Sequence, residues 1–448
     1  MLRIVKLHYV QLMCLRRIIQ SNSQFSPHFR KDYNMNITNE LIAQKIYDFI
    51  TYTLPEREKN ASYYRTDQPV NKGRIIQGRP NNILRTNICK YITDVHTGYF
   101  MGVPLTLDFN DDVLGGTFVH NMPRDLLYEL LFSLSRDMSI YGTAFCLVYT
   151  KNGSVAVSKQ SPERAFSITD DSLGHEVVAS VRFSAVDKDE IRGEVYVPGG
   201  RYDFIYADKA VTMSAFVPLE YDGISLIEFP NNEDKCGDFA PILSLMDAYN
   251  VLLSGAVDDM QSVSNAFLAL YGMQGTTRED IEEANISRVL SLSENGRAEF
   301  VVKNVNPDAL DSLKKTLLDN MLLVTMTPNL LDESFGKADS GVALEYKLWG
   351  IEQARGEKQR YFTRALFTLL EGIFAYIGIK NIPHDICSVR FYKNLPRDSS
   401  KICQDIANVG DIISHKTKLE LLPFIENAGE ELEKIRIEKE NKNETEQN

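Results

Sequence analysis

The chain has 448 residues, of which 44% are hydrophobic, so it is long enough for two or three domains with ample core. Its formal net charge of −12 excludes a protein that grips nucleic acid over its whole surface, because such binding draws its affinity from Lys and Arg side chains that neutralise phosphates. The six cysteines are scattered without a CxxC pair, which favours reduced, buried thiols over a zinc site or a disulfide framework.

The first 34 residues are basic and carry an apolar patch from Ile4 to Leu15. Lys6 interrupts this patch and no small-residue cleavage site follows it, which argues against a signal peptide. Met35 opens a sequence typical of a natural start, so we expect residues 1–34 to be disordered or to precede the true start codon. No stretch approaches a membrane span, and no membrane partner is expected.

Residues 35–237 read as one α+β block. Helical patterns cover Leu41 to Leu54 and Ile83 to Met101, and a third begins near Pro123. Asn152 and Gly153 mark a hairpin turn. The predicted strands are Val103–Phe109, Thr143–Tyr149, Ser154–Lys159, Val177–Ser184, Gly193–Tyr196, Tyr202–Tyr206 and Ser225–Phe229. Helices followed by strands, without βαβ alternation, indicate an α+β fold.

The most distinctive pattern is a helix from Asp238 to Tyr271, with apolar residues at a 3.6 period and Gly272 as its expected end. At 1.5 Å per residue it reaches roughly 50 Å, longer than one compact core requires. We expect it to cross between parts of an assembly.

A small α/β unit and a second helix follow. Residues 272–305 hold a short acidic helix from Thr277 to Asn285, in which Thr277 and Asp280 are placed like a capping pair, and a hairpin whose strands flank Asn295 and Gly296. Residues 306–329 hold a helix from Pro307 to Thr327, with Asn306 as its expected cap. Its predicted apolar stripe consists of Leu310, Leu313, Leu317, Met321 and Val324.

A glycine-bearing polar loop, residues 330–341, then leads into a third long helix from Val342 to Ile377, within residues 342–396. Charges of both signs surround its centre, which fits a subunit boundary or a solvated channel wall; they are Glu352, Arg355, Glu357, Lys358 and Arg360. Trp349 and Tyr346, near its start, are expected to pack against a neighbour. Residues 397–448 should form two short helical segments and then, from Glu426, a solvated helix or a disordered tail.

Motifs for catalysis and cofactor binding are missing. The GK pair Gly336–Lys337 fails as a phosphate-binding loop, because Leu331 and Ala338 stand where a glycine and a Ser or Thr are needed. The seven histidines show no metal-binding spacing, and His96 reads as a satisfied core or interface residue. Adjacent carboxylates such as Asp258 and Asp259 point apart, as expected on a solvated surface. We therefore expect no cofactor, no metal and no enzymatic activity.

The order helix, small α/β unit, helix, polar loop, long helix resembles the portal proteins of long-tailed bacteriophages, in the family typified by phages of Gram-positive bacteria. The similarity runs from about Met35 to Glu433. The segments that carry it are NNILRTNICKYITDVHTGYFMGVPLTL (Asn81–Leu107), YGTAFCLVYTKNGSVAVSKQSPERAF (Tyr141–Phe166), LMDAYNVLLSGAVDDMQSVSNAFLALYG (Leu245–Gly272), DSGVALEYKLWGIEQARGEKQRYF (Asp339–Phe362) and FYKNLPRD (Phe391–Asp398).

The resemblance implies a ring of about twelve copies at one capsid vertex, built in the host cytoplasm, through which double-stranded DNA is packaged and ejected. Residues 35–237 would be the wing, 238–271 and 306–329 the stem, 272–305 the clip, 330–341 the tunnel loop and 397–448 the crown. Implied partners are the terminase large subunit, head-completion or adaptor proteins, and major capsid and scaffolding proteins.

Three groups of site residues follow from this reading. The tunnel loop would present Lys337 to DNA among acidic neighbours, namely Asp332, Glu333 and Asp339. The clip would offer an acidic docking face to the motor, namely Glu279, Asp280, Glu282 and Glu283. The subunit interface would include Glu352, Arg355, Lys358 and Arg360.

Two other functions remain open at this point. The chain could be an enzyme of the packaging apparatus, although it lacks a phosphate-binding loop and a convergent acidic cluster. It could also be a scaffolding or adaptor protein that uses its long helices as a coiled coil, although its apolar stripe does not keep strict heptads.

Overall fold

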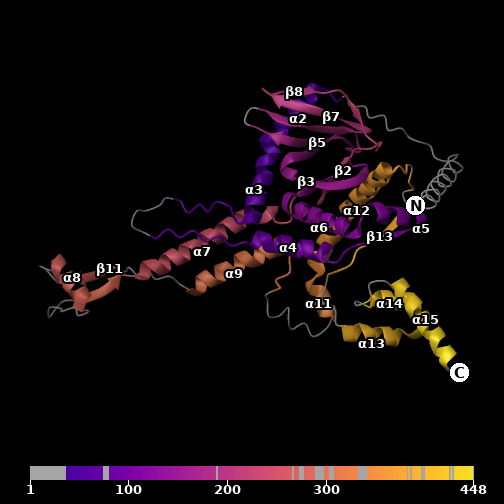
Figure 1. Ribbon diagram of the computed structural model, residues 1–448. Helices are drawn as coiled ribbons and strands as arrows, with labels where there is room; N and C mark the ends of the chain where they lie inside the picture. Colours follow the sequence, from indigo (N-terminus) through magenta and orange to yellow (C-terminus); the bar gives the residue numbers. More distant parts are fainter. Residues whose placement is uncertain are drawn as a thin grey trace.

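The structure is a computed structural model that describes residues 37–73, 80–187, 190–264, 267–271, 277–287, 297–301, 307–330, 341–380, 382–383, 386–394, 399–422, 425 and 428–446. An α+β body carries a projecting pair of long helices with a small unit at its far end, and short helices follow near the C-terminus (Figure 1). The predicted α+β class is confirmed. The extension 1–34 lies outside the described residues.

One end of the body is a six-stranded antiparallel sheet. Its strands pair in the order β4 (Ala165–Thr169), β5 (Val177–Val186), β6 (Ile191–Val197), β7 (Gly200–Ala207) and β8 (Ala210–Met213), with β9 (Val217–Pro218) also on β7. Helix α2 (Asn39–Asp48), capped by Thr38, buries Ile42 and Ile46 against this sheet. A π turn (Phe49–Thr53) and α3 (Leu54–Arg65) carry the helix on well past its predicted end at Leu54.

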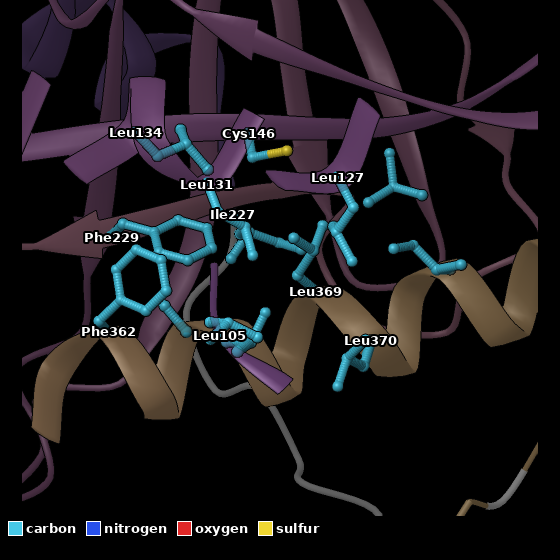
Figure 2. Packing of buried hydrophobic residues seen from close by; sticks show 14 of the residues in the cluster. Leu105, Leu127, Leu131, Leu134, Cys146, Ile227, Phe229, Phe362, Leu369 and Leu370 are labelled. Carbon is cyan, nitrogen blue, oxygen red and sulfur yellow. The ribbon is translucent and has the colours of Figure 1, made fainter. Parts of the chain in front are cut away.

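The main core lies under a second sheet. Strands β10 (Leu226–Pro230), β2 (Thr143–Lys151) and β3 (Ser154–Gln160) pack against α6 (Arg124–Tyr141) and α12 (Trp349–Ile377). Figure 2 shows Phe229 meeting Phe362, whose ring centroids are 5.3 Å apart. The predicted β2–β3 hairpin is confirmed, because Asn152 and Gly153 both have positive φ, as its turn requires.

Helix α4 (Ile88–Met101) leads into β1 (Thr106–Phe109), which pairs with β13 (Cys387–Arg390). Helix α5 (Asp112–Asn121) was not predicted, because two adjacent glycines weaken its helical pattern. The Asp111 side chain stabilises it by accepting hydrogen bonds from the backbone N–H groups of Val113 and Leu114.

The projecting pair consists of α7 (Leu243–Ser264), preceded by a 3₁₀ turn (Ala240–Ile242), and α9 (Pro307–Val324). The distal unit contains β11 (Phe267–Tyr271), α8 (Arg278–Ser287) and β12 (Arg297–Val301). The predicted helix from Asp238 to Tyr271 is therefore wrong at both ends. The run Phe267–Tyr271 suits a strand as well as a helix, and its antiparallel pairing with β12 makes it a strand.

The structure also bears on the predictions for the distal hairpin, the third long helix and the C-terminal segments. Strand β12 follows Gly296 as expected, whereas Gly272 and the segment before Asn295 lie outside the described residues. The third long helix is present as α11 (Gly341–Lys347) and α12, separated at Leu348. Near the C-terminus lie α13 (Ser399–Val409), α14 (His415–Leu421) and α15 (Ala428–Glu446), so the two short segments are confirmed and the tail is helical.

Candidate functional site

The two projecting helices are packed together mainly at their base. There a cluster of buried apolar residues holds Met246 of α7 against Met321 and Leu322 of α9. Along the rest of the pair few side chains are buried. The predicted stripe of α9 is correct for Met321, but Leu313 and Val324 are exposed and lie outside the packed face.

A second element runs along α7. We call it the finger and define it as residues 66–73 and 80–87, which connect α3 to α4. Three backbone N–H groups of the finger, at alternate residues, donate to α7 side chains. The bonds run from Thr86 to Asn250 Oδ1 (2.9 Å), from Leu84 to Ser254 Oγ (2.9 Å) and from Asn82 to Asp258 Oδ1 (2.7 Å).

The spacing of these bonds explains their regularity. Four residues of a helix rise about 6 Å, and two residues of an extended chain advance about 6.6 Å, so the two repeats stay in register. Asn250 and Ser254 are fully buried by the contact, and Asp258 also bonds Lys72. The expectation that Asp258 lies on a solvated surface is wrong, because the finger covers it.

Among the described residues, one helix, Ala240–Gln261, is long and apolar enough to cross a membrane by length and composition alone. By these two criteria, the expectation that no stretch approaches a membrane span is wrong. However, its polar stripe binds the finger, and only 22% of the apolar window is buried within the chain. Most of its apolar side chains are only partly buried within one chain.

A buried polar cluster joins the base of the pair to the body. Asp238, which precedes α7, accepts a hydrogen bond from Lys358 Nζ at 2.7 Å and another from Asn231 Nδ2 at 2.8 Å. His96 of α4 lies beside Asp238, with Nδ1 3.7 Å from the carboxylate. Its Nε2 lies 3.0 Å from the carbonyl oxygen of Thr325, at the end of α9. We call these residues the junction cluster.

Burial and neighbouring charges shift the pKa values of the two titratable groups Asp238 and His96 in opposite directions. Burial would raise the pKa of Asp238, but Lys358 and His96 outweigh it and hold that pKa well below its usual range. Burial lowers the pKa of His96, although Asp238 partly opposes the shift. Lys358 is only 3% exposed, so its predicted place at a subunit interface is wrong. His96 is confirmed as a satisfied core histidine.

The other predicted interface residues of α12 divide into two kinds. Glu352 is half-buried and accepts hydrogen bonds from Tyr99 Oη at 2.7 Å and from Arg355 at 2.7 Å. Partial burial raises its pKa, yet these bonds outweigh that effect and lower the pKa to about 2. Arg360 is exposed and makes no ion pair with the residues that the structure describes. Arg360 therefore remains available to a neighbour.

The tunnel-loop residues Asp332, Glu333, Lys337 and Asp339 lie outside the described residues. The structure does place the start of the loop. The hydroxyl of Tyr91 donates to the carbonyl oxygen of Pro328 at 2.8 Å and accepts from the N–H of Leu330 at 3.0 Å. The loop thus leaves α9 from a fixed point on α4, and α11 begins directly after it.

In the distal unit the predicted capping pair is present, since the N–H and hydroxyl of Thr277 both donate to Asp280 Oδ2 at 2.8 Å. Glu279, Asp280 and Glu282 are exposed, and Glu282 pairs with Arg278. The side chain of Glu283 lies outside what the structure describes. No group of three His, Cys, Asp or Glu side chains suited to a metal ion occurs in the described part of the chain.

Comparison with known proteins gives the family of the chain. The family model described as phage portal protein, SPP1 Gp6-like, matches residues 43–445. A portal protein of Clostridium phage phiCD119 is 20% identical over 425 residues, covering 84% of this chain and 90% of the relative. A portal protein of Bacillus phage SPP1 is 19% identical over 375 residues, covering 78% of this chain and 74% of the relative. The chain therefore belongs to the SPP1 Gp6-like family of phage portal proteins.

Proposed function

We propose that about twelve copies of this chain form a closed ring at one vertex of a phage capsid, and that double-stranded DNA enters and leaves through its channel. The wing, stem, clip, tunnel loop and crown have the boundaries given above, with the stem helices shortened to α7 and α9. The family is a structural component of the virion rather than an enzyme.

The observation that carries this proposal is the sparse cover of α7. A helix apolar enough to span a bilayer has only 22% of its apolar window buried in a single chain. Most apolar side chains of α7 are only partly buried in a single chain and Met260 is exposed, which is typical of a surface that another copy completes. The helix projects with its partner α9 beyond the body (Figure 1), so other copies of the chain can reach it.

Electron microscopy and native mass spectrometry of the purified chain test the ring directly. A closed particle of about 0.6 MDa with a central hole, the mass of about twelve 50.9 kDa copies, supports the proposal. A monomer at high concentration, or a rod-like dimer, contradicts it and favours an adaptor built on a coiled coil.

The channel and docking roles are separate parts of the proposal. Lys337 in the tunnel loop makes a weak ring of phosphate contacts, one per copy, that moving DNA breaks easily. Lys337→Glu should reduce packaged DNA while rings still form, and wild-type amounts of packaged DNA would overturn this role. The clip docks the terminase large subunit during packaging and head-completion or adaptor proteins afterwards, and the body meets capsid and scaffolding proteins.

A further inference from the structure

The finger and α9 lie on opposite sides of α7. Tyr249 lies on the side that packs towards Leu318 of α9, whereas Ser254 and Asp258 bind the finger. At 100° per residue, Asn250, Ser254 and Asp258 lie about 100°, 140° and 180° around α7 from Tyr249. Figure 1 shows the same arrangement, with the finger above α7 and α9 below it. The stem of one chain is therefore a layer of three elements with two free flanks.

The free flank of α9 carries a regular, uncharged stripe. Its members follow one another at intervals of four and three residues and are all exposed, namely Ala309, Leu313, Thr316, Asn320 and Leu323. The two polar members bond to their own helix, because Thr316 donates to the carbonyl of Ser312 and Asn320 donates to that of Thr316. The stripe thus offers a face suited to packing against another element.

The finger also exposes apolar side chains. Ile83 is 48% exposed and Leu84 is 38% exposed, on opposite faces of the extended backbone that buried side chains of α7 hold in place. Arg85, next to them, is exposed, as is the acidic Asp319 at the margin of the α9 stripe. The two flanks therefore match in polarity and carry opposite charges at their edges.

The two flanks also lie at the same level along the stem. Tyr249 of α7 lies beside Lys314 and Leu318 of the antiparallel α9. Ser254, which holds Leu84, is five residues further out and so is level with residues 309–313 of α9. Leu84 and Leu313 therefore occupy opposite flanks of the stem at equal height.

We propose that the finger of one copy docks onto the α9 stripe of the next copy around the ring. The proposal rests on the ring assembly proposed above and names one of its contact surfaces. A closed ring is generated by rotation without translation along its axis, so surfaces that meet must lie on opposite flanks at the same level. A two-fold dimer would instead join a surface to itself.

Cross-linking of paired cysteines tests this contact. The variant carries Ile83→Cys and Leu313→Cys in a background with Cys14, Cys236 and Cys403 replaced by serine, and assembled protein is treated with a short bismaleimide. We expect a ladder of covalent species that extends to the full ring, since each copy links to the next. Products that stop at a dimer would overturn the proposal. The pair Ile83→Cys and Leu173→Cys, with Leu173 fully exposed in the body, should give no ladder.

Electron microscopy of the same samples separates failure of this inference from failure of the proposed function. Rings that form but give no ladder overturn the finger contact and leave the ring intact. Absence of rings from the unmodified chain contradicts the proposed function itself. As a second measurement, Leu313→Glu should lower the fraction of chains in rings about tenfold or more, because it places a charge in a packed contact. Lys315→Glu, outside the stripe, should assemble normally, and equal assembly of both variants would overturn the proposal.

Discussion

Lys358 and Asp238 form a buried ion pair in which Lys358 Nζ lies 2.7 Å from Asp238 Oδ2. Both side chains are less than a tenth exposed. The pair joins the middle of α12 to the residue from which the stem leaves the body, and His96 connects it to the end of α9. This polar cluster and the apolar cluster around Met246 and Met321 together hold the base of the projecting pair on the body.

Replacing one member of this pair should destabilise the chain strongly. In Lys358→Met the carboxylate of Asp238 stays buried without its cation, and loss of one partner of a buried pair costs about 3–5 kcal/mol. The loss is measured as the shift in the free energy of unfolding by urea, followed by circular dichroism. The double variant Lys358→Met with Asp238→Asn should recover much of it, because no charge is left buried. Arg360→Met on the exposed face of α12 is the control, and a Lys358→Met chain as stable as this control would contradict the prediction.

The junction cluster should also make stability fall as the pH is lowered. Burial lowers the pKa of His96, so below about pH 6.5 the unfolded chain takes up a proton that the folded chain does not, and stability falls. Asp238 acts at lower pH. Its folded pKa is depressed, so its contribution is present above about pH 4 and is lost as the pH falls further.

Unfolding midpoints measured between pH 7.5 and 5 would check the His96 contribution. In His96→Gln the side-chain amide can still donate to the carbonyl of Thr325, but it cannot titrate. This variant should lose less stability over that range than the unmodified chain. Identical slopes for the two proteins would show that His96 does not titrate differently on folding.

Much of the fold could be predicted because local patterns agree with tertiary structure. The β2–β3 hairpin follows from Asn152–Gly153, and α9 from Pro307 and its apolar spacing. The outer end of α7 could not be placed, since Phe267–Tyr271 becomes a strand only through pairing with Arg297–Val301, a contact across the distal unit. Helix α5 was missed because a side-chain cap, rather than helix propensity, supports it.

The site was less predictable, because burial decides what a charged residue does. Lys358 falls between Ile351 and Phe362 on the buried face of α12, at helical spacings of seven and four. That spacing was the available signal for a core lysine with a buried partner. Polar residues recur every four positions on the apolar helix α7, namely Asn250, Ser254 and Asp258. This spacing was the sequence signal for a polar contact along one face of the helix. Their partners lie more than 150 residues away in sequence and could not be inferred.

Charge reversal on α12 should separate assembly from folding. Arg355 bonds Glu352 and Gln359 within its own chain, so Arg355→Glu should lower the unfolding midpoint of the unassembled chain. Arg360→Glu removes no bond among the described residues and should leave that midpoint unchanged, but it should lower the fraction of rings seen by electron microscopy. Wild-type ring formation by Arg360→Glu would contradict the placement of this part of α12 at a subunit boundary.

Neutralising the acidic face of α8 should reduce docking of the terminase large subunit while rings remain intact. Glu279, Glu282 and Glu283 are changed to glutamine, and Asp280 is kept because it caps the helix. Rim charges of this kind act mainly on the association rate, so the loss should be greatest at low salt. A matched triple change on α15, at Glu431, Glu433 and Glu438, should bind normally. Equal binding of both triple variants would indicate that the α8 acids are only solvated.

Ring assembly should shift the fluorescence of Trp349, the sole tryptophan of the chain. In a single chain its side chain is 64% exposed, and Tyr346, three residues earlier, is 77% exposed. The next residue, Gly350, lies close to Met326, which is also exposed. An aromatic patch of this kind is typical of an interface, so the emission maximum should move to shorter wavelength and acrylamide quenching should fall as chains enter rings. An assembly-deficient variant such as Leu313→Glu, at the same concentration, should keep the emission of the exposed indole. Rings whose emission and quenching equal those of that variant would show that Trp349 faces solvent in the assembly, and the patch would then have to meet a partner other than a second copy.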